Sequence, residues 1–170
     1  MSMDKLWAPW RVKYITRLKD QGKKSRCVFC KISREKNDKK NFIFLRTDRC
    51  FSVLNIYPYN NGHVLIVPYR HVDDPAKLRK EERDDLFELL LSTKTILEKT
   101  MKPGGYNIGI NLGRTAGAGF PGHIHIHIVP RWAGDANFMP VTASTKVISQ
   151  SLETLFDRLY RCVHEKKSKN

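Results

Sequence analysis

One stretch of this 170-residue chain reads His123-Ile124-His125-Ile126-His127-Ile128, a strict alternation of polar and apolar side chains. A period of two is typical of a β-strand, whose successive side chains point to opposite faces of a sheet. We therefore expect three imidazoles on one face and three isoleucines in a core on the other. Each imidazole carries a donor and an acceptor that need partners, so such a row packs poorly. A functional site is favoured over a histidine-rich solvated face, because three of the six histidines fall within five residues.

A single metal ion does not explain all three imidazoles. Residues on one face of a strand are spaced by about 6.5–7 Å, which separates His123 from His127 by about 13 Å. Zinc binds nitrogen at about 2.0–2.1 Å, so two neighbouring histidines could share an ion but three in a straight row could not. The row predicts divided roles, with one histidine for the chemistry and its neighbours for support.

The composition is that of a cytoplasmic globular protein of one domain. Hydrophobic residues make up 41% of the chain and charged residues 28%, which is ordinary for such proteins. No apolar run approaches about 18 residues and no signal-peptide pattern is present, so neither a membrane nor export is expected. Four cysteines, two of them in Cys27-Val28-Phe29-Cys30, do not resemble a disulfide framework.

A formal net charge of +14 indicates attraction to a polyanion, either a polyphosphate substrate or a nucleic acid. A solvated basic surface is an equal alternative, because lysine and arginine are spread along the chain. Nucleic acid is the less favoured partner. A dedicated binder more often combines such charge with exposed aromatic residues on a recognisable motif.

The periodicity along the chain predicts an α+β domain with an antiparallel sheet of about five strands and two main helices. One helix is expected over residues 80–101, ending before a Pro-Gly-Gly sequence, and the other over residues 145–163. Residues 1–40 form a basic N-terminal extension, residues 41–163 the main domain and residues 164–170 a disordered basic tail. Strands are expected over residues 41–45, 49–56, 63–67 and 106–112, over the histidine run, and near residues 138–141.

The segment from Gly122 to Val129 resembles the signature of the histidine triad (HIT) family of nucleotide hydrolases and transferases, in which three histidines alternate with apolar residues. The resemblance extends to Asn55, to residues 61–68 and to residues 111–113, and it covers residues 4–160. The stretches 6–11 and 130–138 are similar to the bacterial branch of the family. Members of that branch cleave diadenosine polyphosphates, some by hydrolysis and some by phosphorolysis.

The resemblance implies that His125 attacks the α-phosphorus and forms a nucleotidyl-histidine intermediate. Imidazole is a competent nucleophile at pH 7, because its unperturbed pKa of about 6.5 leaves most of it unprotonated. His127 is expected to orient or stabilise the phosphate, and His123 completes the triad. His63 is a candidate partner that orients the triad through a hydrogen bond, with a satisfied core histidine as the alternative.

A glycine-rich loop over residues 113–122 leads into the triad, and glycine lets backbone N–H groups approach phosphate oxygens. A flexible hairpin would have the same composition. The resemblance implies contacts of Asn55 with the ribose and of Asn111 with phosphate. An apolar wall for the base is expected from the early strands, or these residues are simply core: Phe44, Leu54 and Ile56. The candidate substrate-binding residues are Asn55, Asn111, Gly113, Arg114, Gly117 and Gly119.

The chain departs from the family just before the triad, where many relatives carry Gln, Ser or Thr. Here the sequence is Gly119-Phe120-Pro121, which offers no side-chain donor. The acceptor that resolves the intermediate, water or inorganic phosphate, therefore stays open. A divalent cation such as Mg²⁺ can accompany the polyphosphate.

The spacing of Cys27 and Cys30 is that of a zinc knuckle. In a zinc-bearing subset of the family, the ligands are such a pair, a histidine that follows a strand-ending proline, and the first triad histidine. The resemblance thus implies a closed, structural Zn²⁺ site of Cys27, Cys30, His71 and His123. A redox Cys-x-x-Cys pair is the rival, although it favours a thioredoxin-like setting that the pattern lacks, and a pair of buried thiols is the simplest alternative.

The resemblance implies an enzyme that splits dinucleoside polyphosphates of the diadenosine tetraphosphate type and works as a homodimer. One alternative is a nucleoside phosphoramidate hydrolase of the same fold. Another is a non-catalytic module that binds nucleotides or RNA. The preferred phosphate-chain length, the base and the pathway are left open.

Overall fold

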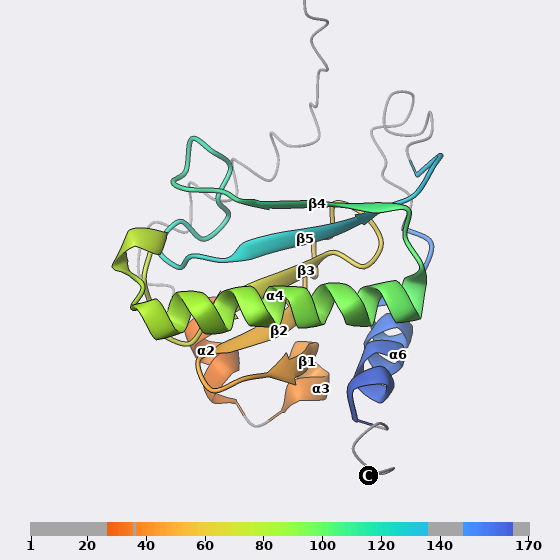
Figure 1. Cartoon of the computed structure of the whole chain (residues 1–170), viewed down its shortest axis with the longest axis horizontal. Helices are drawn as coiled ribbons and strands as arrows, with labels where there is room; N and C mark the ends of the chain where they lie inside the picture. The colour runs from red at the N-terminus through yellow and green to blue at the C-terminus, as the bar shows by residue number, and fades with distance from the viewer. Residues whose placement is uncertain (1–26, 36, 136–147, 165–170) are drawn as a thin grey trace, which may run out of the picture.

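The computed structural model describes residues 27–35, 37–135 and 148–164. Within these ranges, five strands form one antiparallel sheet in the order β1-β2-β3-β5-β4 (Figure 1). The strands are β1 (Ile43–Arg46), β2 (Cys50–Leu54), β3 (Val64–Pro68), β4 (Gly105–Ile110) and β5 (Ile126–Arg131). The helices are α2 (Val28–Arg34), α3 (Asp38–Asn41), the 3₁₀-helix η1 (Pro75–Lys77), α4 (Lys80–Met101) and α6 (Leu152–His164). The predicted α+β class with an antiparallel sheet is confirmed.

Helix α4 runs along one face of the sheet, with α6 beside it and against β1 (Figure 1). Its buried residues Leu86, Leu90 and Leu97 are spaced by four and seven positions and so form one apolar stripe. They belong to the same core cluster as the three isoleucines of the histidine run. The alternation therefore works as predicted, because the isoleucines face α4 and the histidines lie on the opposite face.

Helix α2 packs on that opposite face through Phe29, its only buried residue. Phe29 joins a second core cluster with Ile43, Phe51, Val53, Leu65 and Val67, which come from the first three strands. The pairing of β3 with β5 places Leu65 opposite His127, so the row of side chains on this face continues from the cluster into the histidines. The triad thus lies beside the apolar cluster that α2 covers.

Some predicted bounds differ from the structure. Strand β5 begins at Ile126, because the backbone N–H of Ile124 donates to the carbonyl of Val72 instead of joining the β3–β5 ladder. Helix α6 begins at Leu152, where the Ser151 hydroxyl accepts from the Thr154 backbone N–H, and residues 148–151, which belong to the predicted helix, are not helical.

The short helices α2 and α3 were not predicted. Each is seven residues or fewer, too short to show a helical period. The predicted strand near residues 138–141, most of the N-terminal extension and most of the basic tail fall outside the described residues. Among the described residues, no helix is long and apolar enough to cross a membrane.

Candidate active site and metal cluster

The imidazole of His125 is held so that one nitrogen is left free to react. His125 is 6% exposed, and its Nδ1 lies 2.9 Å from the backbone carbonyl of His123. A carbonyl oxygen can only accept, so Nδ1 carries the proton and donates it. Nε2 then keeps its lone pair. Burial also lowers the pKa of His125, which favours the neutral ring that a nucleophile needs.

The opposite arrangement holds for His127, and a chain of hydrogen bonds fixes it. The backbone N–H of Tyr59 donates to Nδ1 of His63 at 3.0 Å, so the proton of the His63 ring sits on Nε2. That nitrogen lies 2.9 Å from Nδ1 of His127 and donates to it. His127 must then carry its own proton on Nε2, which lies 3.4 Å from Nδ2 of Asn111; because Nδ2 is also a donor, no hydrogen bond joins these two atoms in this tautomer. The triad therefore presents a lone pair on one histidine and an N–H donor on the next.

Burial keeps these rings neutral. Loss of solvation is the largest cause of a lowered pKa at both sites, with repulsion from neighbouring histidines second. It lowers the pKa of His63 to about 3 and that of His127 to about 4. At pH 7 each ring thus has one donor and one acceptor, and the proton order of the chain is maintained.

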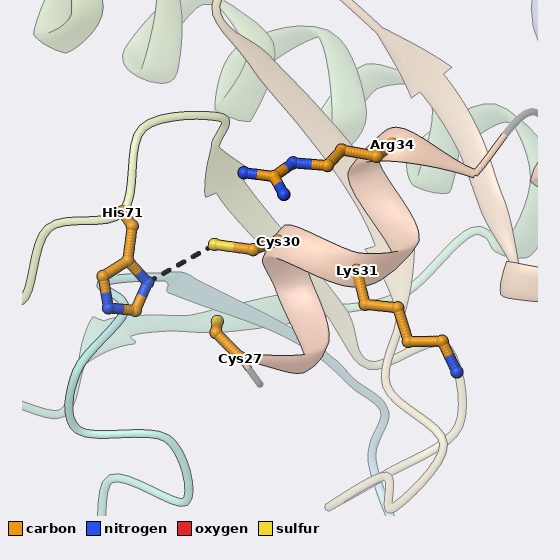
Figure 2. A pocket seen from close by; sticks show the side chains of 5 residues that line it. All are labelled: Cys27, Cys30, Lys31, Arg34 and His71. Carbon is orange, nitrogen blue, oxygen red and sulfur yellow. Dashed lines mark hydrogen bonds between the residues drawn. The ribbon is translucent and has the colours of Figure 1, made fainter. Parts of the chain in front are cut away.

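A second cluster lies next to the triad. Cys27, Cys30, His71 and His123 place one sulfur or nitrogen atom each within 4.8 Å of all the others. The Sγ of Cys27 is 3.3 Å from Nδ1 of His123, and the Sγ of Cys30 is 3.4 Å from Nδ1 of His71. Figure 2 shows the two cysteines and His71 pointing toward one another from α2 and from the loop after β3.

The geometry of this cluster fits a tetrahedral metal ion. Zinc bonds of about 2.3 Å to sulfur and 2.0–2.1 Å to nitrogen place ligand atoms about 3.3–3.8 Å apart. Observed separations include 3.2 Å between the two Nδ1 atoms and 3.6 Å from the Cys30 Sγ to the His123 Nδ1. The Nε2 of His123 donates to the carbonyl of Pro68 at 2.9 Å, so its Nδ1 lone pair faces the sulfurs. The donor set and its orientation therefore suit a Cys₂His₂ site.

Comparison with known proteins identifies the family. The HIT domain profile matches residues 36–134, more than half of the chain. This chain belongs to the HIT family. It is 34% identical to an AP-4-A phosphorylase from Mycobacterium tuberculosis over 155 residues, which cover 88% of this chain and 79% of the relative.

Two further relatives extend the comparison. An asymmetrical bis(5'-nucleosyl)-tetraphosphatase from Schizosaccharomyces pombe is 37% identical over 93 residues, 55% of this chain and 50% of the relative. A Zn-bound histidine triad protein from Mycobacterium smegmatis superposes with a TM-score of 0.65, covering 85% of this chain and 97% of that one. Its 23% identity supports the shared fold only.

Of the candidate substrate-binding residues other than Asn55, one lies beside the triad and the rest lie in the loop that follows β4. Asn111 lies at the end of β4, beside His127. Gly113 and Gly117 have φ angles of +78° and +87°, a left-handed backbone that favours glycine. Arg114 is exposed. Within the loop, the carbonyl of Arg114 accepts from the N–H of Gly117, and the carbonyl of Gly113 accepts from the N–H of Ala118. Gly119 is half-buried near the end of the same loop. A phosphate cradle in this loop stays a prediction.

Asn55 contacts His63, the histidine that is hydrogen-bonded to His127. Its amide nitrogen is 3.2 Å from Nδ1 of His63, and its Oδ1 accepts from the backbone N–H of Tyr57 at 2.9 Å. The expected base wall is wrong for Phe44 and Leu54, because both are buried in the core on the α4 face, opposite the histidines. Ile56 lies beyond the end of β2 and is 55% exposed.

Sequence reasoning missed Tyr59. Its backbone N–H sets the proton of His63, and its ring stacks on His127 with centroids 5.6 Å apart and planes at 16°. The surrounding Pro, Asn and Gly residues gave only a loop signal, so nothing in the periodicity pointed to it.

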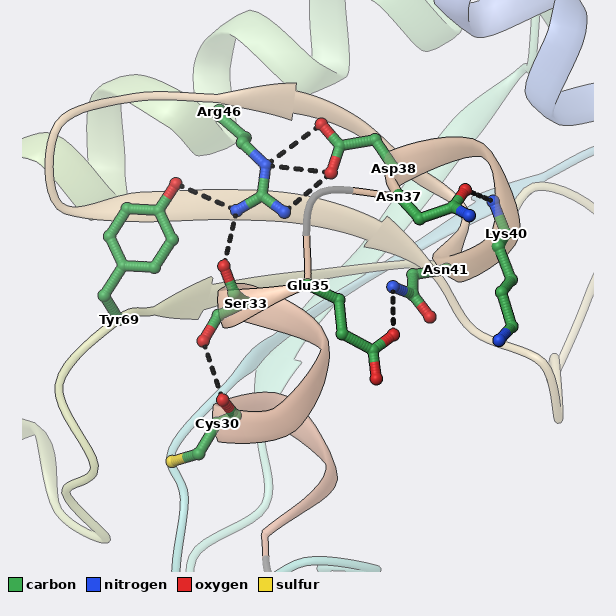
Figure 3. Close-up of polar contacts among 9 residues, drawn as sticks. All are labelled: Cys30, Ser33, Glu35, Asn37, Asp38, Lys40, Asn41, Arg46 and Tyr69. Atoms are coloured by element: carbon green, nitrogen blue, oxygen red, sulfur yellow. Dashed lines mark hydrogen bonds and ion pairs between the residues drawn. The ribbon is translucent and has the colours of Figure 1, made fainter.

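A polar network anchors α2 at its far end, as Figure 3 shows. The guanidinium of Arg46 on β1 donates to both carboxylate oxygens of Asp38 at 2.7–3.1 Å and to the backbone carbonyl of Ser33 at 3.3 Å. The hydroxyl of Ser33 in turn donates to the carbonyl of Cys30 at 3.2 Å. Helix α2, which follows Cys27 and carries Cys30, is therefore tied to the sheet independently of any metal.

Proposed function

We propose that this HIT protein cleaves dinucleoside polyphosphates of the diadenosine tetraphosphate type through a nucleotidyl intermediate on His125. The main support is the tautomer of each triad histidine: Nε2 of His125 has a lone pair, and Nε2 of His127 carries a proton. The lone pair attacks the α-phosphorus, a P–N bond forms, and the P–O bond to the leaving polyphosphate breaks with its electrons. An acceptor then displaces the histidine from the nucleotidyl group.

The neighbouring residues have supporting roles in this proposal. His127 donates its Nε2–H to a phosphate oxygen as negative charge develops there. His63, backed by Tyr59 and Asn55, keeps that proton in place. Asn111 and the loop of Gly113, Arg114, Gly117 and Gly119 hold the remaining phosphates, where Arg114 supplies positive charge and the glycines supply backbone N–H groups. His123 belongs to the metal cluster and orients the start of the triad. A divalent cation such as Mg²⁺ enters with the polyphosphate.

Inorganic phosphate is the acceptor that we favour. An AP-4-A phosphorylase relative aligns over 88% of this chain and 79% of its own length. Hydrolysis is the second candidate, supported by the tetraphosphatase relative. Phe120 packs against the α2 cluster just before the triad and brings no polar side chain to the acceptor. Phosphoramidate hydrolysis on the same fold and a non-catalytic nucleotide- or RNA-binding role are the remaining alternatives.

We also propose that Cys27, Cys30, His71 and His123 hold a structural Zn²⁺. All four positions of a tetrahedron would be filled by protein ligands, which leaves no site for substrate. The bound ion would fasten α2 to the loop after β3 and to the first triad histidine. This site needs free thiolates, which agrees with a cytoplasmic, reducing location.

A homodimer is the assembly that we propose. Among the described strands, β4 lies at one end of the sheet and has β5 as its only partner. Ile108 and Ile110 on this strand are 48% and 40% exposed. An exposed apolar edge strand suits a second copy of the same chain. Light scattering should give twice the chain mass, and Ile110→Lys should halve it.

Product analysis with diadenosine tetraphosphate tests the proposed activity. ADP plus ATP formed only in the presence of inorganic phosphate would establish phosphorolysis, and AMP plus ATP without phosphate would establish asymmetrical hydrolysis. His125→Ala should abolish turnover and keep nucleotide binding. Absence of turnover under both conditions would overturn the proposal and favour phosphoramidates or a binding role.

A further inference from the structure

Phe29 connects the metal cluster to the triad. It lies between the two cysteines of Cys27-Val28-Phe29-Cys30, is 4% exposed, and points from α2 into the face of the sheet that carries the histidines. Its ring centroid is 5.1 Å from that of His125, 5.4 Å from that of His123 and 5.5 Å from that of Phe120. One aromatic side chain thus contacts a candidate metal ligand, the candidate nucleophile and the turn before the triad.

The nucleophile needs such a contact, because its polar anchoring is weak. Among the residues that the structure describes, the His125 ring makes one protein hydrogen bond, from Nδ1 to the His123 carbonyl. A single bond at one edge leaves the ring able to pivot about that bond. Two neighbouring rings limit this pivot by contact, His127 with its centroid 4.8 Å away and Phe29 with its centroid 5.1 Å away.

The position of Phe29 is itself fixed from both ends of its helix. The cysteine on each side of it contacts a histidine of the sheet region, Cys27 with His123 and Cys30 with His71. The Arg46 network holds the last turn of α2. The Phe29 backbone therefore cannot shift relative to the triad while these contacts hold.

We propose that Phe29 is a positioning residue that holds the His125 imidazole with Nε2 toward the substrate, so that the Cys₂His₂ cluster acts on the nucleophile through this ring. The inference rests on the proposed role of His125 and adds a residue outside the triad to the same site. It predicts that loss of the ring slows the chemical step more than it weakens substrate binding. Small displacements of a reacting group can cost about 100-fold in rate.

The test compares Phe29→Ala and Phe29→Leu with a control on the same helix, Ile32→Ala. Ile32 packs against the same apolar cluster one turn further along α2. For Phe29→Ala, kcat with diadenosine tetraphosphate should fall about 10- to 100-fold, with KM within about threefold of wild type. Phe29→Leu keeps part of the volume and should retain an intermediate kcat, whereas Ile32→Ala should keep kcat within about twofold.

Imidazole ¹⁵N chemical shifts provide a readout that does not depend on turnover. In the wild-type protein with zinc bound, His125 should show a protonated Nδ1 and an unprotonated Nε2. In Phe29→Ala the two signals should move toward an average of both tautomers, and in Ile32→Ala they should not move. If Phe29→Ala does not fold, Phe29→Leu is compared with Ile32→Ala instead, and smaller changes in kcat and in the His125 ¹⁵N shifts are expected.

The outcomes separate the two proposals. Wild-type protein without turnover would overturn the proposed activity, while the ¹⁵N comparison would still decide the role of Phe29. If both Phe29 variants have the same kcat and the same His125 ¹⁵N shifts as Ile32→Ala, the Phe29 ring only fills space. That result would overturn the inference. If the Phe29 variants raise KM and leave kcat unchanged, the inference is overturned as well.

Discussion

The proton on Nε2 of His127 depends on His63, and replacing His63 with phenylalanine tests this dependence. The two rings have similar shape, and His63 is 1% exposed, so the change leaves little empty volume. It removes the donor to Nδ1 of His127 at 2.9 Å and the acceptor shared by the Tyr59 N–H at 3.0 Å and the Asn55 side-chain amide at 3.2 Å. Each buried group left without a partner costs about 1–3 kcal/mol.

Three losses of this size give a decrease of about 3–9 kcal/mol in the free energy of unfolding, before any gain from burying a more apolar ring. The effect on catalysis follows from the first loss alone. If about 1–3 kcal/mol of support for the Nε2–H form of His127 disappears, kcat should fall roughly 5- to 150-fold. The tautomer with the proton on Nδ1 then competes and has no donor to offer a phosphate oxygen.

The assay combines denaturant unfolding, steady-state kinetics with diadenosine tetraphosphate and ¹⁵N shifts of the His127 ring. Ser52→Ala is a matched control, because Ser52 makes a buried hydrogen bond to Thr93 at 2.7 Å on the α4 side of the sheet. It should lower stability by about 1–3 kcal/mol with kcat unchanged. A His63→Phe protein that keeps wild-type kcat, or keeps the His127 proton on Nε2, would refute the reasoning.

Four further outcomes are expected. Cys30→Ser should reduce bound zinc from about one ion per chain to a small fraction, measured by atomic absorption, and should lower Tm; unchanged zinc content would contradict the ligand assignment. Wild-type stability should fall as pH decreases from 6.5 toward 4, because unfolded His63 takes up a proton that the folded protein resists with its pKa of about 3. At pH 5 this amounts to about 2 kcal/mol and should be missing in His63→Phe; equal pH slopes in urea titrations would count against it. Glu82→Gln should lower the free energy of unfolding at pH 7 by about 1 kcal/mol or less, because hydrogen bonds from Arg70 at 2.5 and 2.8 Å lower the pKa of Glu82 to about 2. That difference should shrink as pH falls from 4.5 toward 2, and a constant difference would argue against an ionic contribution. Phe44→Ala should lower unfolding stability by about 3–5 kcal/mol with kcat unchanged, since Phe44 is 1% exposed in the α4-side core; a matching loss of kcat would place it in the site instead.

Local pattern alone determined much of the fold. Alternation at residues 123–128 was enough to assign the isoleucines to the core and the histidines to the opposite face, because side-chain direction in an extended chain depends only on residue parity. The helical period and the Pro-Gly-Gly stop gave the bounds of α4 as the structure has them. The short helices α2 and α3 and the start of α6 were missed because capping and tertiary contacts, and not periodicity, set them.

Resemblance to the HIT family named most candidate site residues, but no spacing could bring them together. Cys30 and His71 are 41 residues apart in the chain, and only the docking of α2 on the sheet places their ligand atoms 3.4 Å apart. The proton positions depend on the backbone of Tyr59 in a loop and on the carbonyl of His123, groups that every sequence has. The sequence by itself determined which side chains face which way, because that is a local property of the backbone. Tertiary structure decided which nitrogen of each histidine can react, because hydrogen-bond partners distant in the chain set it.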